Sequence, residues 1–393
     1  MRKSKFRITA FIAILLCFAL AASVLSGCSN ADGKDGIDGI TPHIGENGNW
    51  WIGDVDTGIK AAGNSRVTPE MFGAVGDGVA DDTEAMLKAL KTGKPVYLTK
   101  TYRVTELDCT GLEKIVMYGN EDVSARLSTF PVKDDVYNII FEGKLLFKNA
   151  PSRISLEQIM FFAKNSGALV NTKVSGAWIH QCNFTYFNGL FMGGMDGFSN
   201  ISENVFFQMR GPVGTDCADS IISSNYINSQ LGSRVTLFSG TRFTGMHFSN
   251  NYVDYFKIGF GKYEHWEYNI IENNIFDLIF RAFQTETSFN DTTVTGNTFH
   301  YVTGPEGWDG FADDEMKSED WIIFNITGEC NRTNISANSG DMPVALKMTN
   351  VNNPCDTFID LSGVKGTIEF GYYNTSNAAG STIVVKDWDY ITV

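Results

Sequence analysis

Long apolar segments are scarce in this chain of 393 residues, and beyond residue 27 no run of 18 or more apolar residues occurs. Because a helix needs about 20 apolar residues to cross a bilayer, we expect nothing beyond residue 27 to span one. Cysteine is also sparse: five cysteines follow Cys28, widely spaced and without a CxxC pair. This leaves no zinc-ligand spacing. We expect most of these cysteines to be small, buried side chains. One disulfide between two of them is an alternative that the sequence does not decide.

Basic residues are in the minority. The chain has 31 Lys and Arg against 45 Asp and Glu, a net charge of −14. Residues 1–27 hold four basic and no acidic side chains, so their removal would bring the charge to −18. Such an acidic surface excludes nucleic acid as a partner, because that binding depends on neutralising phosphates. It also disfavours polyanionic glycans, unless a basic strip or a cation intervenes.

The first residues have the pattern of a secretory signal. A basic stretch, RKSKFR, precedes an apolar run from Ile8 to about Leu25, and small residues end it. The sequence Leu25-Ser26-Gly27-Cys28 resembles a bacterial lipobox. This resemblance implies cleavage before Cys28, lipidation of its thiol, and a lipid-anchored place at the surface of the bacterial cell envelope. The alternative is an ordinary secreted protein with an unmodified cysteine.

Composition divides the chain into three segments. Residues 1–27 form the signal, residues 28–65 a glycine-rich tether, and residues 66–393 one larger domain. In the tether, Gly33, Gly36 and Gly39 keep a collagen-like period of three. So few triplets are too short for a stable triple helix.

A degenerate repeat runs through the large domain. Its copies read IHQCNF, ISENVF, ISSNYI, FSNNYV, IENNIF and VTGNTF, with asparagines at Asn183, Asn204, Asn225, Asn251, Asn274 and Asn297, and weaker copies carry Ile159 and Asn338. From Asn183 to Asn297 the gaps are 21 to 26 residues, and the 41 residues between Asn297 and Asn338 are nearly two periods. A fixed period of this length predicts a solenoid. Each coil would stack about 4.8 Å from the next, with the asparagines hydrogen-bonded into a ladder.

The stretch FGAVGDGVADDTEA at residues 72–85 precedes the repeat. It is no phosphate-binding loop, because GAVGDG is not GxGxxG and no Lys-Ser or Lys-Thr follows. We expect Asp81 or Asp82 to cap a helix, with Glu84 completing a capping box. Met86, Leu87 and Leu90 form the apolar stripe of this helix. VYLTKTYRVTELD then alternates like strands.

The stretch at residues 72–85 and the segment that follows it resemble the signature of a known superfamily. FGAVGDGVADDTEA, a short helix and VYLTKTYRV resemble the N-terminal signature of the pectate-lyase superfamily, the pectin-lyase-like right-handed parallel β-helix proteins. The resemblance implies an all-β fold whose N-terminal helix caps the open end of the stack and protects its edge. Thr99-Lys100-Thr101 departs from the usual Pro-x-Gly. The fold hosts lyases, hydrolases, phage tailspikes and non-enzymes, so it does not decide a reaction.

A candidate catalytic column lies in one turn, 8 to 11 residues before each ladder asparagine. Successive coils place there Asp196, Asp216, Arg242, Glu264 with His265, and Glu286. If these residues are in register, adjacent coils bring carboxylates about 5 Å apart and alternate coils about 10 Å. Carboxyl pairs at such distances suit retaining or inverting glycoside hydrolysis. We therefore expect the four acids to be catalytic.

Substrate binding is assigned to nearby residues. Arg242 and His265 would contact the glycan, and Trp178, Tyr263 and Trp266 would stack on sugar rings. The alternative for the whole column is a set of solvated acidic turns.

A lyase is a further alternative, since scattered arginines could act as its base. AWIHQCNF resembles the vWIDH segment of calcium-dependent pectate lyases, but His180 and Gln181 replace its Asp and His. The departure removes a calcium-site carboxylate, so we expect no cofactor and no metal site, with calcium as an alternative that the motif does not support.

The sequence thus predicts a cell-surface lipoprotein that acts on a polysaccharide or cell-surface glycan, by hydrolysis before a lyase reaction. A non-catalytic glycan-binding or adhesive protein is the alternative. A tailspike-like trimer is a weaker alternative, since β-helices of this kind and collagen-like segments can both form trimers. The acidic stretch at residues 304–321 is either a loop on the binding face or a solvated bulge.

Overall fold

The structure is a computed structural model that describes residues 42–44, 49–60, 66–119, 137–229, 235–300, 321–349, 351–352, 356–370, 373–374 and 382–384. The chain divides into two compact units, Met1–Asn64 and Ser65–Val393. The predicted signal, the lipobox with Cys28 and nearly all of the 304–321 stretch lie outside the described residues.

The first unit contains a small antiparallel sheet where the sequence predicts only a tether. Its strands are β1 (Pro42–Ile44), β2 (Asn49–Ile52) and β3 (Val55–Lys60), in the order β1-β2-β3. The sequences NWWI and VDTGIK are rich in β-forming residues. Gly53, with φ of 60°, makes the tight turn between the last two strands.

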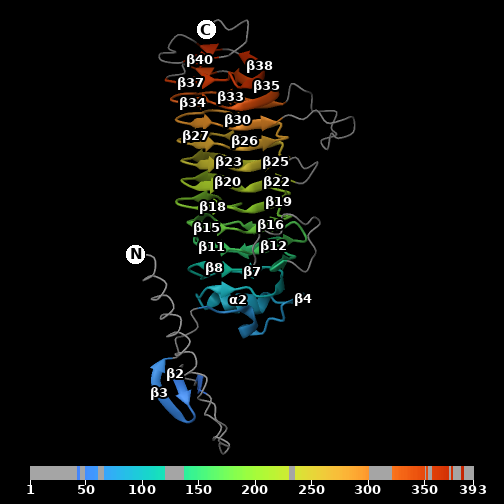
Figure 1. Ribbon diagram of the computed structural model, residues 1–393, viewed down its shortest axis with the longest axis vertical. Coiled ribbons are helices and arrows are strands. Elements are labelled where there is room, and N and C mark those ends of the chain that lie inside the picture. The colour runs from blue at the N-terminus through green and yellow to red at the C-terminus, as the bar shows by residue number, and fades with distance from the viewer. Residues whose placement is uncertain are drawn as a thin grey trace, which may run out of the picture. The chain divides into compact units, whose positions relative to one another are not determined.

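The second unit is a right-handed parallel β-helix, as the sequence predicts (Figure 1). Each coil crosses three faces. Face A is a 12-stranded sheet. Its strands are β5 (Val96–Tyr97), β8 (Ile115–Tyr118), β11 (Ile154–Glu157), β15 (Ala177–His180), β18 (Asn200–Ser202), β21 (Ile221–Ser223), β24 (His247–Ser249), β28 (Ile270–Glu272), β31 (Thr293–Thr295), β34 (Asn334–Ser336), β37 (Phe358–Asp360) and β40 (Thr382–Val384).

Face B follows the ladder turn, and face C follows the next turn. The strands of face B are β4 (Asp77–Asp81), β6 (Thr101–Val104), β9 (Ile139–Phe141), β12 (Met160–Ala163), β16 (Asn183–Thr185), β19 (Val205–Met209), β22 (Tyr226–Ser229), β25 (Tyr252–Asp254), β29 (Ile275–Asp277), β32 (Thr298–His300) and the start of β35 (Ser339–Thr349). Those of face C are β7 (Leu107–Asp108), β10 (Leu145–Lys148), β13 (Ala168–Val170), β20 (Gly214–Ala218), β23 (Thr236–Thr244), β26 (Ile258–Tyr263), β30 (Arg281–Thr285), β33 (Ile322–Thr327), the rest of β35, and β38 (Val364–Phe370).

Short strands lead from face C back to face A. They are β14 (Val174–Ser175), β17 (Met195–Asp196) and β27 (His265–Glu267), and β20 and β23 extend into the same position. A separate pair joins β36 (Val351–Asn352) to β39 (Tyr373–Asn374).

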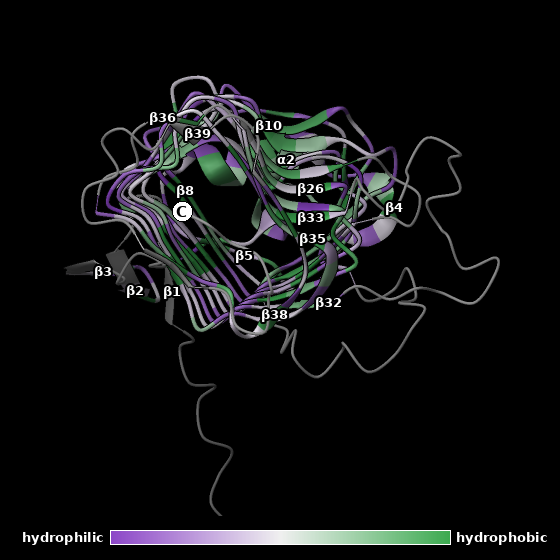
Figure 2. Cartoon of the chain, turned by 90° about the horizontal axis from the view of Figure 1, so that it is seen from above, coloured by the Kyte–Doolittle hydropathy of each residue, from purple (hydrophilic) through white to green (hydrophobic). Residues whose placement is uncertain are grey.

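The interior is a continuous stack of apolar side chains, and the faces superpose along the axis (Figure 2). Ring stacks follow the coil spacing. Phe161, Phe184 and Phe206 have successive ring centroids 4.9 and 5.4 Å apart. Phe260 stacks on Phe283 at 5.2 Å with an angle of 7°. Each coil therefore buries its apolar surface only against its neighbours, which explains why the repeat has to continue over many copies.

The asparagine ladder is confirmed, with one correction. Asn204, Asn225, Asn251, Asn274, Asn297 and Asn338 are buried, and the side-chain oxygen of each later member accepts the backbone N–H and amide of the member before it.

Asn183 is wrongly placed in the ladder by the sequence. Val205 is its partner in register, and Cys182 stands opposite Asn204, whose side-chain oxygen accepts the N–H of Cys182 at 2.8 Å. The earlier ladder slots are thus filled by apolar residues, Ile159 and Cys182, both buried.

The N-terminal helix is confirmed as α2 (Thr83–Lys91), preceded by the 3-10 helix η1 (Pro69–Phe72). Its buried residues Ala85, Met86, Ala89 and Leu90 join the core. Of the two candidate caps, Asp81 does bond the start of the helix, because its Oδ1 accepts the N–H of Thr83 at 3.0 Å. The capping box is wrong, since Glu84 instead pairs with Lys88 at 2.8 Å. Asp82 stands at the N-cap without a side-chain cap bond, and its buried carboxylate instead accepts the N–H groups of residues 75 and 76 at 2.7 and 3.2 Å. The acidic residue therefore fixes the glycine-rich loop itself.

Cys109, Cys182, Cys217 and Cys330 are buried free thiols, as expected of small core residues. Burial raises the pKa of the Cys109 thiol to about 12. Within the described part of the chain, no helix has the length and apolarity needed to cross a membrane.

Candidate functional site

The predicted catalytic column does not form a single register. Met195 pairs with Cys217, so Asp196 stands opposite Ala218 rather than opposite Asp216. The turn to face A is one residue shorter in this coil, since Asp196 precedes Asn200 by four residues and Ala218 precedes Ile221, the partner of Asn200, by three. Counting back from the asparagines therefore does not keep the register, because a change of one residue alters which side chains stand opposite each other.

Asp196 is held between two cations. Its carboxylate accepts a hydrogen bond from Arg242 Nη2 at 3.0 Å and forms an ion pair with Lys173. Lys173 first, and then Arg242, hold the pKa of Asp196 below its usual value. A carboxylate so stabilised is a poor general acid near neutral pH, and the same contacts occupy Arg242.

Asp216 has φ of 49° and supports the backbone of the next coil. Its Oδ1 accepts the N–H of Thr241 at 2.6 Å, the hydroxyl of Thr241 at 3.1 Å and the N–H of Arg242 at 3.1 Å. These bonds favour a structural role over a catalytic one.

Glu264, His265 and Glu286 are exposed. His265 pairs in register with Arg242, as predicted, with Glu264 one residue earlier in the chain. The structure thus brings Arg242 and His265 together and offsets Asp196 from Asp216, while Glu264 and Glu286 directly follow Tyr263 and Thr285, which are register partners on adjacent coils. A catalytic role for the four acids stays a prediction.

Two of the predicted sugar-stacking residues are wrong. Tyr263 and Trp266 have no exposed surface. Trp266 stacks on Phe243 at 4.8 Å, and its Nε1 donates to Thr292 Oγ1 at 3.0 Å. Both residues belong to the apolar pattern that points inward, which explains their aromatic character without a ligand. Trp178 is 49% exposed, on face A.

A cavity of about 440 Å³ lies beside the strand expected to border the groove. Its lining residues are Asn188, Met192, Arg210, Gly211, Pro212, Val235, Thr236 and Ser239. None of these is acidic, so this hollow offers no carboxylate pair.

A different column, on face B, does contain one. It consists of the third residue after each ladder asparagine: Asn228, Asp254, Asp277 and His300. Asp254 and Asp277 are direct partners in register on adjacent coils, which places their Cα atoms about 4.8 Å apart. The three residues after each ladder asparagine, YIN, YVD, IFD and TFH, all end in a polar side chain. This recurring polar position is the sequence pattern that could have predicted the column.

The two aspartates are only partly satisfied by their neighbours. Asp254 is 7% exposed, and its Oδ2 accepts a hydrogen bond from Asn228 Nδ2 at 3.2 Å. Asp277 Oδ2 accepts one from the Tyr252 hydroxyl at 2.7 Å. Within the described residues, Oδ1 of each is buried without a hydrogen-bond partner. Two such orphaned oxygens on adjacent coils call for an explanation.

Burial and a neighbouring charge act on the pKa of Asp254. Burial first, and then the charge of Asp277, raise the pKa of Asp254 to about 7. Tyr226 and Tyr252 are stacked beside the pair, with ring centroids 5.5 Å apart. Burial and the nearby Asp254 raise the pKa of Tyr226 to about 12. The site therefore combines a carboxyl group protonated below neutral pH with a second one held by a tyrosine.

The raised pKa predicts a pH-dependent stability. Folding favours protonated Asp254, so its ionisation destabilises the fold increasingly as the pH rises from about 4 to its folded pKa of about 7. Asp254→Asn removes this ionisation. We expect it to raise the free energy of unfolding by on the order of 3 kcal/mol at pH 8 and hardly at all at pH 4. Urea unfolding at both pH values checks this. A constant difference between the two proteins would contradict it.

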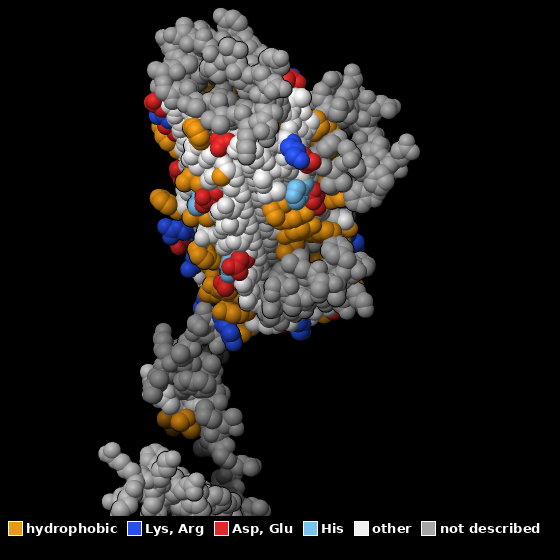
Figure 3. All heavy atoms as spheres, turned by 45° about the horizontal axis from the view of Figure 1, so that its top comes forward, with side chains coloured by type: hydrophobic (Ala, Val, Ile, Leu, Met, Phe, Trp, Pro, Cys, Tyr) orange, Lys and Arg blue, Asp and Glu red, His pale blue; other side chains and the backbone are white. Residues whose placement is uncertain are grey.

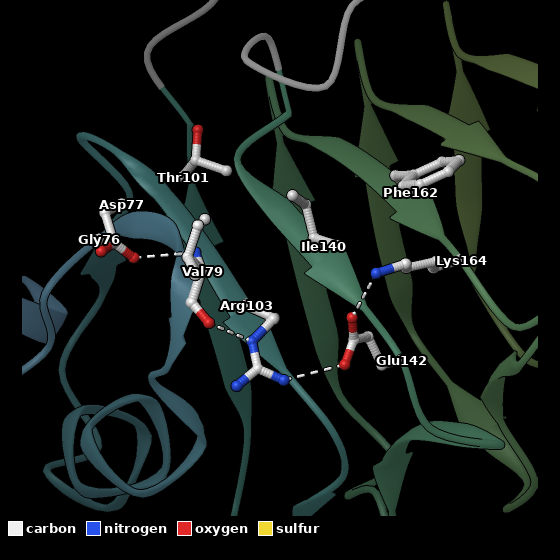
Figure 4. Close-up of a pocket in the computed structure, with 10 residues that line it drawn as sticks. Gly76, Asp77, Val79, Thr101, Arg103, Ile140, Glu142, Phe162 and Lys164 are labelled. Carbon is white, nitrogen blue, oxygen red and sulfur yellow. Dashed lines mark hydrogen bonds and ion pairs between the residues drawn. The ribbon is translucent and has the colours of Figure 1, made fainter.

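A larger cavity, of about 590 Å³, lies at the N-terminal end of face B (Figure 4). Arg103 lies at its centre, donating to the Val79 carbonyl at 2.6 Å and to Glu142 at 2.9 Å. Lys164 donates to the same carboxylate at 2.9 Å. Asp77 also lines the cavity, so the two acidic and two basic side chains of the cavity compensate one another and leave no net charge for a ligand. The cavity also lacks the paired carboxyl groups of the face B site.

No group of three His, Cys, Asp or Glu side chains in the described residues could hold a metal ion. His180, at the place of the calcium-site acid, contacts Ser202 Oγ through Nδ1 at 3.2 Å.

Comparison with known proteins establishes the fold. No family model and no curated protein matches the sequence. Among solved structures, DFA-IIIase from Arthrobacter chlorophenolicus A6 in complex with GF2 aligns with a TM-score of 0.52 and 12% identity, covering 82% of this chain and 92% of that one. The same enzyme in complex with DFA-III gives a TM-score of 0.50 and 13% identity, covering 81% and 86%. At this identity the likeness concerns the fold alone.

Proposed function

We propose that this chain is a glycoside hydrolase that acts on a polysaccharide, with Asp254 and Asp277 as its reacting groups. One observation carries the proposal: two aspartates stand in register on adjacent coils, each with a buried unpaired oxygen, and the pKa of one is raised to about 7. A carboxyl group whose pKa is raised by burial beside a second carboxylate is typical of the general acid in such pairs.

The spacing favours a retaining mechanism. Carboxyl groups about 5 Å apart leave no room for water between them and the sugar, so one of them attacks directly. Asp277, oriented by the Tyr252 hydroxyl, would attack the anomeric carbon while Asp254 gives its proton to the leaving oxygen as the glycosidic bond breaks. Asp254 would then take a proton from water, which displaces Asp277 and releases the sugar. The rate should fall as the pH rises through about 7 and Asp254 loses its proton.

The solved structures with a similar fold support the proposal of a carbohydrate-acting enzyme. DFA-IIIase is an enzyme by its name, and its structures hold GF2 or DFA-III. We extend to this chain only the idea of a carbohydrate substrate, because the residues proposed here come from its own geometry.

We also propose that the protein is anchored by a lipid on Cys28 at the cell envelope. The lipobox-like sequence after an apolar segment supports this. The three segments 1–27, 28–65 and 66–393 follow from the same reading. Mass spectrometry of the membrane fraction would test the anchor, since an unmodified Cys28 or a retained signal would contradict it.

A digestion screen tests the activity. The purified protein is incubated with a panel of polysaccharides, with calcium or with chelator, while reducing ends and the ultraviolet absorbance of unsaturated products are followed together. We expect new reducing ends without absorbance, and equal rates in calcium and chelator. Absorbance would instead indicate a lyase. No product on any substrate would favour a glycan-binding or adhesive protein.

A further inference from the structure

Two exposed aromatic residues have an unfavourable backbone conformation. Phe198 has φ of 61° and is 94% exposed, and Tyr268 has φ of 59° and is 61% exposed. Positive φ is an outlier for a bulky side chain. Such strain persists where the surrounding structure imposes it, and it clusters at functional sites.

Both residues occupy the same position of the repeat, the turn that precedes face A. The register of face A aligns a column of residues that all have positive φ: Gly176, Phe198, Asp219, Gly245, Tyr268, Asp291, Arg332 and Asp356. Glycine and aspartate suit this conformation. An aromatic residue suits it less, although the half-buried Tyr186 and Tyr255 share it elsewhere in the chain. Phe198 and Tyr268 differ from them in their exposure, and a ring that stands in solvent gains little packing in return.

Their spacing is set by the coils. Phe198 and Tyr268 are three coils apart, about 14 Å along the axis. Asp219 and Gly245 lie between them. The carboxylate of Asp219 occupies the space where a side chain on Gly245 would stand. An acceptor group thus lies between two rings, on a line parallel to the axis.

Face A beside this line has a mixed surface. Trp178, Ile221 and Ile270 are 49%, 42% and 43% exposed and belong to one outward column. His247 stands in this same column, and its Nε2 is 2.9 Å from Oε1 of Glu272, which belongs to the next outward column. Figure 3 shows hydrophobic side chains standing among acidic and histidine side chains on the described surface.

We propose that this surface, defined by Phe198, Asp219, Tyr268 and Trp178, binds a glycan chain lying along the axis. The rings would cover the apolar faces of successive sugars, while the carboxylate and the histidine–glutamate pair would bond their hydroxyl groups. Sites for sugars combine apolar faces with a few placed polar groups in this way. The surface is separate from the aspartate pair, because the ladder turn lies between face A and face B.

A protein partner fits less well. A stable protein interface needs about 800 Å² on each side, with an apolar core. Here Asn200 and His247 interrupt the exposed apolar column, and Asp219 separates the rings.

The test removes the rings and keeps the backbone. Asparagine accepts positive φ, so the double variant Phe198→Asn/Tyr268→Asn should fold with a Tm equal to or above that of the wild type. Native electrophoresis in gels cast with pectin, arabinoxylan, mixed-linkage β-glucan or dextran then measures binding. We expect at least one gel to retard the wild type, and the double variant to bind at least tenfold more weakly. Phe358→Ala, which removes a 41% exposed ring elsewhere on face A, should bind like the wild type.

Three results would overturn the proposal: no gel retards the wild type, the double variant is still retarded, or its Tm falls, which would make the rings structural. Light scattering adds a fourth, since an oligomer that the double variant dissociates would show that a second copy covers the surface. Asp277→Asn should be retarded like the wild type, because Asp277 lies on face B and not on this surface. Gel retardation therefore tests the face A surface, and turnover separately tests the hydrolase proposal.

Discussion

Replacing Asp277 by asparagine is expected to lower kcat by about 1000-fold or more, with little change in fold. The amide keeps the shape of the side chain and a hydrogen-bond acceptor for Tyr252, but it cannot attack the anomeric carbon. Asp254→Asn removes the proton donor and should lower kcat by about 100- to 10,000-fold. Reducing-end release from the substrate found in the digestion screen measures both changes.

Asp216→Asn is the matched control. Asp216 is an aspartate on a neighbouring face whose bonds all go to the backbone or hydroxyl of the next coil. Its amide can still accept these bonds, so kcat should stay within about twofold of the wild type. If Asp216→Asn abolishes turnover while Asp277→Asn does not, the turn column is the active site and the face B pair is not.

Replacing Asn274 by alanine is expected to destabilise the fold by about 3–5 kcal/mol. Its side-chain oxygen accepts the backbone N–H and the amide of Asn251 at 2.9 and 3.0 Å. Its own amide donates to the Phe248 carbonyl and to Asn297 Oδ1, both at 2.9 Å. Alanine leaves these groups buried and unpaired, at about 1–3 kcal/mol for each one left unsatisfied. Urea denaturation and amide exchange of the coils around residue 274 measure the loss.

Asn183→Ala is the control for this change. Asn183 is also a buried asparagine in a copy of the repeat, but it stands outside the ladder, and its side-chain oxygen accepts the Thr185 hydroxyl at 2.7 Å. Its loss should cost less than about 2 kcal/mol. Equal losses at both positions would contradict the distinction between ladder and non-ladder asparagines.

The fold could be predicted because its determinants are repeated. The asparagine period and the inward apolar positions recur in every coil, so a single misread copy does not change the result. Asn183 was misread because Cys182 and Asn183 are adjacent and both are buried. Only the register with Val205 shows which of them lies in the ladder slot.

The site was harder to predict, because it depends on single positions. Counting back from the asparagines crosses the turn before face A, whose length differs between coils, so Asp196 stands opposite Ala218 and not opposite Asp216. Counting forward by three residues crosses no turn, and Asp254 and Asp277 could have been found in this way. Their burial and their unpaired oxygens could not, since these depend on packing across coils.

The regular stacking of coils also fixes the distances between side chains along the axis of the β-helix. Every pair of surface groups in one column is separated by a whole number of coils, or steps of about 4.8 Å. The two aspartates are one step apart and the two exposed rings are three. Inserting or deleting a complete coil would change by a single step every separation that spans that point, and it would leave the separations on either side of it unchanged. In a β-helix, the distance between binding groups along the axis can therefore be matched to the repeat length of a polymer by the gain or loss of coils.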